Sequence, residues 1–155
     1  MPNGNSINII DYDERYAWPT VQMWRASMER ALGVKDSHTW DEQLDYLRKL
    51  VVDNAVYLAV EEGTDQVVGF IVIGGTELDQ LYIHVDYQGM GIGTRLLDLA
   101  KAHSPGKLQL YTFAVNENAQ RFYEKQGFYI IKRGIESESG MADIRYEWVA
   151  ERKGH

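Results

Sequence analysis

The chain of 155 residues has no cysteine, no long apolar run and few basic residues. The absence of cysteine excludes disulfides, thiolate metal sites and cysteine nucleophiles. No apolar run approaches the ~20 residues that a membrane-spanning helix needs. The N-terminal sequence MPNGNSINII also lacks the basic flank and apolar core of a signal peptide. We therefore expect a cytoplasmic protein with no membrane partner.

Lysine and arginine total 16 residues against 23 aspartates and glutamates, which gives a formal net charge of −7 at pH 7. Such a chain repels the phosphates of nucleic acid, so we expect no nucleic-acid partner. The length and the 45% hydrophobic content fit one compact core. We expect a single domain over residues 1–155, with frayed ends at 1–5 and 151–155.

The apolar residues change period along the chain, which indicates alternating strands and helices. Thr39 and Glu42 have the spacing of a capping box at the start of one helix. The predicted strands are 7–10, 56–60, 67–73, 77–85, 108–115, 128–133 and 142–149, and the predicted helices are 18–32, 40–51, 94–102 and 116–125. The last strand either ends the sheet or pairs across a homodimer.

One glycine-rich stretch, Gln88-Gly-Met-Gly-Ile-Gly93, lies between a predicted strand and a predicted helix. Glycine lets the backbone approach a phosphate, and a helix N-terminus favours an anion. A tight turn between strand and helix is the other interpretation. A Walker loop does not fit because Thr94-Arg95 follows Gly93, and a dinucleotide fingerprint does not fit because Leu96 replaces its third glycine.

A second motif lies in VNENAQRFYEKQGF, residues 115–128. Asn116 and Tyr123 are seven residues apart, or two helical turns, so both side chains and that of Ala119 point to one side of a helix. Taken alone, Asn116 could be a helix N-cap and Tyr123 a core aromatic.

Together the two segments resemble the GNAT superfamily of N-acetyltransferases. That pattern is Gln/Arg-x-x-Gly-x-Gly/Ala, followed about thirty residues later by Asn-x-x-Ala-x-x-x-Tyr-x-x-x-Gly-Phe. The matching residues are Gln88, Gly91, Gly93, Asn116, Ala119, Tyr123, Gly127 and Phe128. The resemblance implies a small bacterial-type member with an α/β (α+β) fold, in which about four helices flank a mixed sheet of about seven strands.

The resemblance also implies a function. We expect an acetyl-CoA-dependent N-acetyltransferase that uses no metal and acetylates a primary amine, on a small molecule or on a protein, through a ternary complex. The alternative is a non-catalytic acyl-CoA-binding regulatory module. The expected partners are acetyl-CoA and an amine acceptor of unknown identity, and a homodimer stays open.

Acetyl-CoA is expected between strands 77–85 and 108–115. The backbone amides of residues 89–94 would hold its pyrophosphate, and residues 81–83 would line its pantetheine arm. The implied cofactor-binding residues are Leu81, Tyr82, Ile83, Gln88, Gly89, Met90, Gly91, Ile92, Gly93, Thr94 and Asn116. Arg95, Lys101 and Arg121 either reach the outer phosphates or are solvated surface charges.

For catalysis, the resemblance implies that Tyr123 protonates the departing thiolate. It places a general base at Glu77, which could instead be a salt-bridged strand end. Asp79 shares the face of Glu77, and His84 or a water is an alternative base. Position 111 is tyrosine, where the ribosomal-protein acetyltransferases of the superfamily carry a catalytic glutamate.

The acceptor is expected to enter opposite the cofactor, beside residues 23–32, 37–40 and 135–141. Trp24, Met28, Trp40 and Tyr111 either form an aromatic wall of this site or belong to the core.

Overall fold

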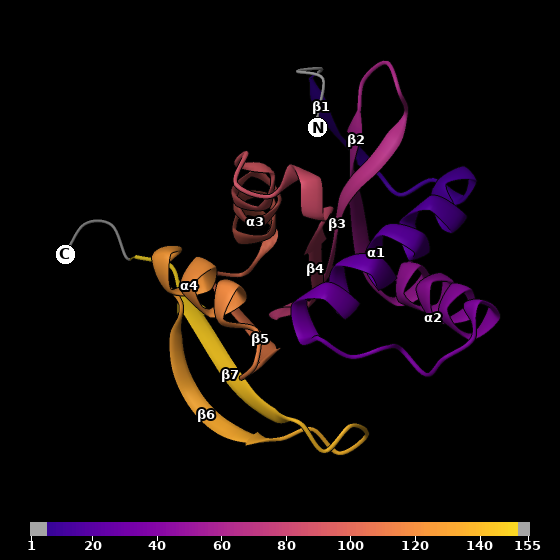
Figure 1. The fold of residues 1–155 in the computed structure, drawn as a ribbon. Helices are drawn as coiled ribbons and strands as arrows, with labels where there is room; N and C mark the ends of the chain where they lie inside the picture. The colour runs from indigo at the N-terminus through magenta and orange to yellow at the C-terminus, as the bar shows by residue number, and fades with distance from the viewer. Residues whose placement is uncertain (1–5, 152–155) are drawn as a thin grey trace.

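The computed structural model describes residues 6–151 (Figure 1). The ends predicted to fray therefore lie outside the described residues, except for Glu151. None of the described helices combines the length and the apolar surface that a bilayer crossing requires.

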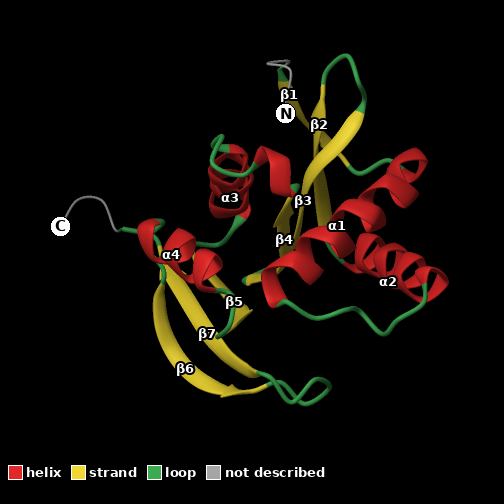
Figure 2. Ribbon diagram, in the orientation of Figure 1, coloured by secondary structure: helices red, strands yellow, loops and turns green. Residues whose placement is uncertain are grey.

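A seven-stranded mixed sheet flanked by four α-helices forms the fold, as the sequence predicts (Figure 2). The strands are β1 (Ile7–Asp11), β2 (Ala55–Glu61), β3 (Gln66–Gly74), β4 (Glu77–Ile83), β5 (Lys107–Phe113), β6 (Tyr129–Ile135) and β7 (Ala142–Val149). The helices are α1 (Ala17–Leu32), α2 (Trp40–Asp53), α3 (Ile92–His103) and α4 (Glu117–Lys125), with 3-10 turns η1 (Glu14–Tyr16) and η2 (Val85–Tyr87).

The strands follow the order β1-β2-β3-β4-β5-β7-β6. Strands β1 to β4 pair antiparallel in sequence, and β7 lies between β5 and β6. The expectation that the last strand ends the sheet or pairs across a dimer is wrong for the described chain, because both edges of β7 are occupied and β6 forms the edge. The sequence of a hairpin strand does not by itself show whether that strand takes the inner or the edge position in the sheet.

Strands β4 and β5 are parallel but pair only where Glu77 faces Gln109. Beyond that pair the two strands diverge, which separates the β1–β4 part of the sheet from the β5–β7–β6 part (Figure 1). The two strands thus form a V-shaped opening at the place where acetyl-CoA is expected.

Two apolar cores hold the helices against the sheet, on opposite faces (Figure 1). Helices α1 and α2 pack on β2 and β3, with Trp24 against Phe70 at the centre of that core. Helices α3 and α4 cover the other face through Leu96, Leu97 and Tyr123. The uncovered face of β5, β6 and β7 thus borders the opening of the V.

Local signals in the sequence fix the ends of several elements. The predicted capping box is present, since the Thr39 amide donates to Glu42 Oε1 at 2.7 Å and the Glu42 amide donates to Thr39 Oγ1 at 3.1 Å. Strand β4 ends at Ile83, two residues earlier than predicted, because His84 caps η2. Helix α3 begins at Ile92, two residues earlier than predicted, because Gly91 takes the N-cap position with φ 83°.

Candidate active site

The divergence of β4 and β5 opens two cavities of about 640 Å³ each. The hairpin-side cavity is lined by β4, β5 and the β6–β7 hairpin, and the loop-side cavity by α1, η2, the glycine stretch and α4. Five residues line both cavities, and we call them the junction: Leu81, Tyr82, Asn116, Ala119 and Tyr123. A molecule that fills one cavity therefore meets a molecule that fills the other at these side chains.

The loop-side cavity has the features of an anion site. Gly89 and Gly91 have φ of 81° and 83°, a region that favours glycine, and this conformation turns the chain into α3. Among the residues that the structure describes, no side chain caps the amides in the first turn of α3, so these amides can bind an anion. Arg30 and Arg121 add positive charge to the cavity lining. These groups fit the phosphates of the predicted acetyl-CoA.

The predicted cofactor-binding residues divide into those that line the loop-side cavity and those that do not. The residues that line it are Leu81, Tyr82, Ile83, Gln88, Gly89, Gly93 and Asn116. The other four, Met90, Gly91, Ile92 and Thr94, do not line it. The Ile92 side chain is buried in the core, so Ile92 can reach a ligand only through its backbone amide. The Thr94 hydroxyl accepts a hydrogen bond from Gln126 at 3.2 Å.

The three basic residues suggested for the outer phosphates differ in whether their side chains line the loop-side cavity or bond to backbone carbonyls. Arg95 donates to the Ile7 carbonyl at 3.0 Å, and Lys101 donates to the Gln126 carbonyl at 2.7 Å near the C-terminal end of α3. Only Arg121 lines the loop-side cavity.

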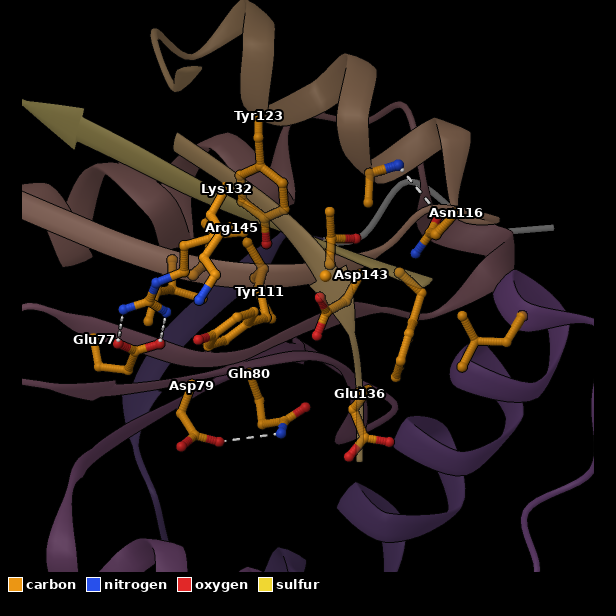
Figure 3. Close-up of a pocket in the computed structure, with 18 of the residues that line it drawn as sticks. Glu77, Asp79, Gln80, Tyr111, Asn116, Tyr123, Lys132, Glu136, Asp143 and Arg145 are labelled. Atoms are coloured by element: carbon orange, nitrogen blue, oxygen red, sulfur yellow. Dashed lines mark hydrogen bonds and ion pairs between the residues drawn. The ribbon is translucent and has the colours of Figure 1, made fainter. Parts of the chain in front are cut away.

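Asn116 and Tyr123 meet at the junction, as their spacing predicts. The Asn116 side chain caps α4 by accepting from the Ala119 amide at 3.2 Å. Tyr123 is buried among Phe122, Phe128 and Tyr146, which its ring contacts edge-on or tilted. In the described part of the chain its hydroxyl has no hydrogen-bond partner, and it points into the cavity in Figure 3.

Burial controls the ionisation of both junction phenols. Removal from water raises the pKa of Tyr82 to about 12. Burial, and secondarily the neighbouring Tyr82, raises the pKa of Tyr123 well above its ordinary value. Both hydroxyls are therefore protonated at neutral pH and can act as hydrogen-bond donors.

The hairpin-side cavity contains a fixed ion pair between β4 and β7 (Figure 3). Arg145 donates to both carboxylate oxygens of Glu77, at 2.6 and 2.7 Å, and to Gln109 Oε1 at 2.8 Å. Its guanidinium also lies 4.3 Å from the ring centre of Tyr111. The salt-bridged arrangement that the sequence allowed for Glu77 is thus present, at the one place where β4 and β5 still pair.

The hairpin contributes to this cavity through Ile135, Glu136 and Ser137, which lie in the segment 135–141 expected beside the acceptor. Sequence reasoning missed the lining residues of the two strands, which are Lys132, Gly134, Asp143 and Arg145. They carry no family motif, but Asp143, Arg145 and Glu147 alternate along β7, which is the signal of a polar strand face.

Other predicted site residues lie elsewhere. His84 lines neither cavity, and its Nδ1 accepts from the Asp86 amide at 3.1 Å. Of the proposed aromatic wall, only Tyr111 lines the hairpin-side cavity. Trp24 belongs to the core, and Trp40 packs against Arg25 with 3.9 Å between guanidinium and ring centre. Residues 6–151 contain no group of three or more side chains arranged to hold a metal ion.

Comparison with known proteins identifies the family. Residues 52–130 match the model of the acetyltransferase (GNAT) domain. The chain is 30% identical over 120 residues to the peptidyl-lysine N-acetyltransferase YjaB of Escherichia coli, and the match covers 77% of this chain and 80% of YjaB.

Solved structures agree with this assignment. The solution structure of apo YjaB from Escherichia coli superposes with a TM-score of 0.76 at 26% identity, and covers 94% of this chain and 99% of that one. The paia N-acetyltransferase of Thermoplasma acidophilum, solved with coenzyme A, has the same fold, with a TM-score of 0.71 at 20% identity over 93% of this chain and 99% of that one. The chain belongs to the GNAT family and is an acetyl-CoA-dependent N-acetyltransferase.

Proposed function

We propose that this enzyme transfers the acetyl group directly from acetyl-CoA to a lysine side chain of a protein, with both substrates bound at once. The observation that carries the proposal is the junction, where two cavities of similar size share five residues. A thioester that extends through the loop-side cavity would meet an amine from the hairpin-side cavity at Tyr123. The chain has no cysteine that could carry the acetyl group between the two substrates.

A protein lysine is favoured over other amines by two observations. The related enzyme of Escherichia coli is named a peptidyl-lysine N-acetyltransferase. The rim of the hairpin-side cavity is also open, since Tyr111 is 61% and Ile135 73% exposed. A long side chain on a protein surface can enter such a cavity while the rest of the protein stays outside.

The charges of the hairpin-side cavity fit a cationic acceptor. Four carboxylates line it against two basic side chains, and one of those two, Arg145, is already paired with Glu77. The lining that remains carries more negative than positive charge, which attracts an ammonium ion.

In the loop-side cavity, we assign the pyrophosphate of acetyl-CoA to the backbone amides of residues 89–94. Leu81, Tyr82 and Ile83 would lie along the pantetheine arm, and Asn116 would contact it from α4. This assignment draws on the uncapped first turn of α3, the positive φ of Gly89 and Gly91, and the lining of the cavity.

We assign the role of general acid to Tyr123. Its raised pKa keeps the phenol protonated, and its hydroxyl faces the junction with no hydrogen-bond partner among residues 6–151. Tyr123 would donate its proton to the sulfur of the departing thiolate. Replacement by phenylalanine removes only the hydroxyl, so turnover should fall by at least about 100-fold while affinity for acetyl-CoA changes little.

The base role of Glu77 stays a prediction. Because both of its oxygens accept from Arg145, Glu77 can take up a proton only if one of these hydrogen bonds is given up. The cytoplasmic location and the homodimer also stay predictions.

Thiol release from acetyl-CoA, followed over lysine peptides, N-terminal peptides, polyamines and aminoglycosides, tests the proposal. We expect the highest kcat/KM with lysine peptides, and intersecting initial-velocity lines because both substrates bind before transfer. Parallel lines would contradict direct transfer. Tight CoA binding without release with any amine would favour the non-catalytic module.

A further inference from the structure

The proposed lysine acceptor arrives as an ammonium ion, and the inference made here rests on that proposed function. A lysine amine has an unperturbed pKa near ~10.4 and is almost fully protonated at neutral pH. It must lose a proton before its nitrogen can attack a thioester. The groups of the enzyme that could accept this proton are the four carboxylates of the hairpin-side cavity, Glu77, Asp79, Glu136 and Asp143.

Three of these carboxylates are already engaged. Both oxygens of Glu77 accept from Arg145. Both oxygens of Glu136 accept backbone amides of its own loop, at 2.7 and 3.0 Å. The Ser139 side chain first, and then these amides, lower the pKa of that carboxyl. Asp79 is exposed and accepts from Gln80 Nε2 at 3.1 Å.

The fourth carboxylate, Asp143, is half-buried. In the range 6–151 it accepts no hydrogen bond and forms no ion pair, and Figure 3 shows it pointing into the cavity. The neighbouring strand leaves room for it, because a Cβ added to Gly134 would lie 3.3 Å from Asp143 Oδ1. An unpaired, partly desolvated carboxylate is costly unless a cation is bound beside it during function.

Asp143 is also level with the junction. Parallel strands β4 and β5 pair at Glu77 and Gln109, so four residues further along they reach Leu81 and Phe113. Asp143 lies opposite Phe113 in the register of β5 and β7. Glu77, in contrast, lies four residues before Leu81, or about 13 Å along the strand. Of the two carboxylates, Asp143 is the one at the level of the junction along the strands.

We propose that Asp143 is the general base that accepts a proton from the acceptor ammonium. The neutral nitrogen then forms a bond to the acetyl carbon, and the bond between that carbon and sulfur breaks. Tyr123 gives its proton to the sulfur and regains one from the nitrogen. Asp143 releases its proton to solvent, so that the products are the acetylated amine, the free thiol and one proton.

Several charged or titratable groups face the same cavity as Asp143. They are Glu77, Asp79 and Tyr82 of β4, Tyr111 of β5, Tyr123 of α4, Lys132 of β6, Glu136 of the hairpin loop and Arg145 of β7.

The kinetic test compares Asp143→Asn with the wild type over pH 6 to 10, with Asp98→Asn on the exposed face of α3 as a control. Asparagine keeps the shape but cannot accept the proton, so kcat at pH 7 should fall by at least about 100-fold. The difference should shrink toward pH 10, because the amine is then increasingly neutral in solution. A difference that is small, or that stays constant across this range, would overturn the proposal.

A binding measurement separates loss of the base from loss of folding. Calorimetry of the enzyme with CoA bound compares a lysine peptide with its norleucine counterpart, which lacks the amine. The wild type should prefer lysine by about 10- to 100-fold, the range for a hydrogen bond to a charged group, and Asp143→Asn should lose most of that preference. CoA affinity should be equal in the two proteins. An unchanged preference for lysine would overturn the proposal.

Asp143→Glu supplies the second variant. It keeps a carboxylate and displaces it by one methylene, so it should retain the pH dependence of the wild type at reduced kcat. A pH dependence like that of the asparagine variant would count against the base role. A wild type that acetylates free amines but no lysine peptide would contradict the proposed acceptor alone, and the same comparisons are then made with that amine.

Discussion

The ion pair between Glu77 and Arg145 should stabilise the vertex of the V, and Arg145→Met tests this. The side chains of Arg145 and Glu77 are 14% and 39% exposed, so the pair lies between a surface pair and a buried one. Surface pairs contribute up to ~1 kcal/mol, and breaking a buried pair costs ~3–5 kcal/mol. The hydrogen bond to Gln109 and the contact with Tyr111 each add about 0.5–1 kcal/mol.

From these contributions we expect Arg145→Met to lower the free energy of unfolding by about 2–3 kcal/mol. For a chain of this size that corresponds to a fall in Tm of about 5–10 °C. Urea unfolding followed by circular dichroism gives the free energy, and a thermal scan gives Tm. The matched control is Arg48→Met, which breaks another arginine–glutamate pair, to Glu14, whose side chains are both more than half exposed. This control should unfold almost like the wild type.

A double-mutant cycle with Glu77→Gln isolates the pair from the packing of Arg145 on Tyr111. The coupling energy should reach at least about 1 kcal/mol, above the value of most exposed pairs. Equal stability of the Arg145 and Arg48 variants, or a coupling energy near zero, would refute the structural role of the pair.

Three further predictions concern the anion loop, one histidine and one helix cap. Gly91→Asp should abolish CoA binding in calorimetry, because it sets a carboxylate beside the uncapped amides of α3, whereas Gly91→Ala, with the same strain at φ 83°, should retain most of it. His38 bonds Asp36 at 2.7 Å and Glu138 at 2.9 Å, and the hydrogen bond with Asp36 is the first cause of its raised pKa. The stabilisation that protonated His38 gives the folded state is therefore full below pH ~6.5 and is lost as pH rises through the raised pKa. His38→Gln should lower the free energy of unfolding at pH 6 by a few tenths of a kcal/mol, because the site is exposed, and should have no effect at pH 9. Equal effects at both pH values would contradict the assignment. Thr39→Ala removes one side of the capping box and should cost about 1 kcal/mol in urea unfolding, with Thr39→Ser close to the wild type.

Local signals in the sequence carried most of the fold. Apolar periodicity, the capping box and the glycines at element ends depend on neighbours within a few residues, and each of these is present in the structure. The place of β7 between β5 and β6 depends instead on pairing between distant strands, and the alternation within β7 is the same at an edge or inside a sheet.

In the candidate site, too, the parts built from local motifs could be predicted and the parts built from distant strands could not. The loop-side cavity is built mainly from two contiguous motifs, and seven of its predicted residues line it. The hairpin-side cavity gathers β4, β5 and the last hairpin, whose residues are up to about seventy positions apart in the sequence. Glu77 could be identified as a strand-end carboxylate, but its partner Arg145 could not, because the two residues meet only through the strand order that places β4 and β7 on either side of β5.

The splay of the sheet also explains why the carboxylates of the hairpin-side cavity differ in their surroundings. Where β4 and β5 still pair, the carboxylate of Glu77 is held by a side chain of the protein, Arg145. Four residues further along, the strands have separated, and Asp143 faces a space wide enough for a substrate. A carboxylate at the vertex therefore suits a structural role, and one at the open end suits a role toward the acceptor. The same divergence that creates the opening thus separates the residue that holds the sheet from the residue that meets the amine.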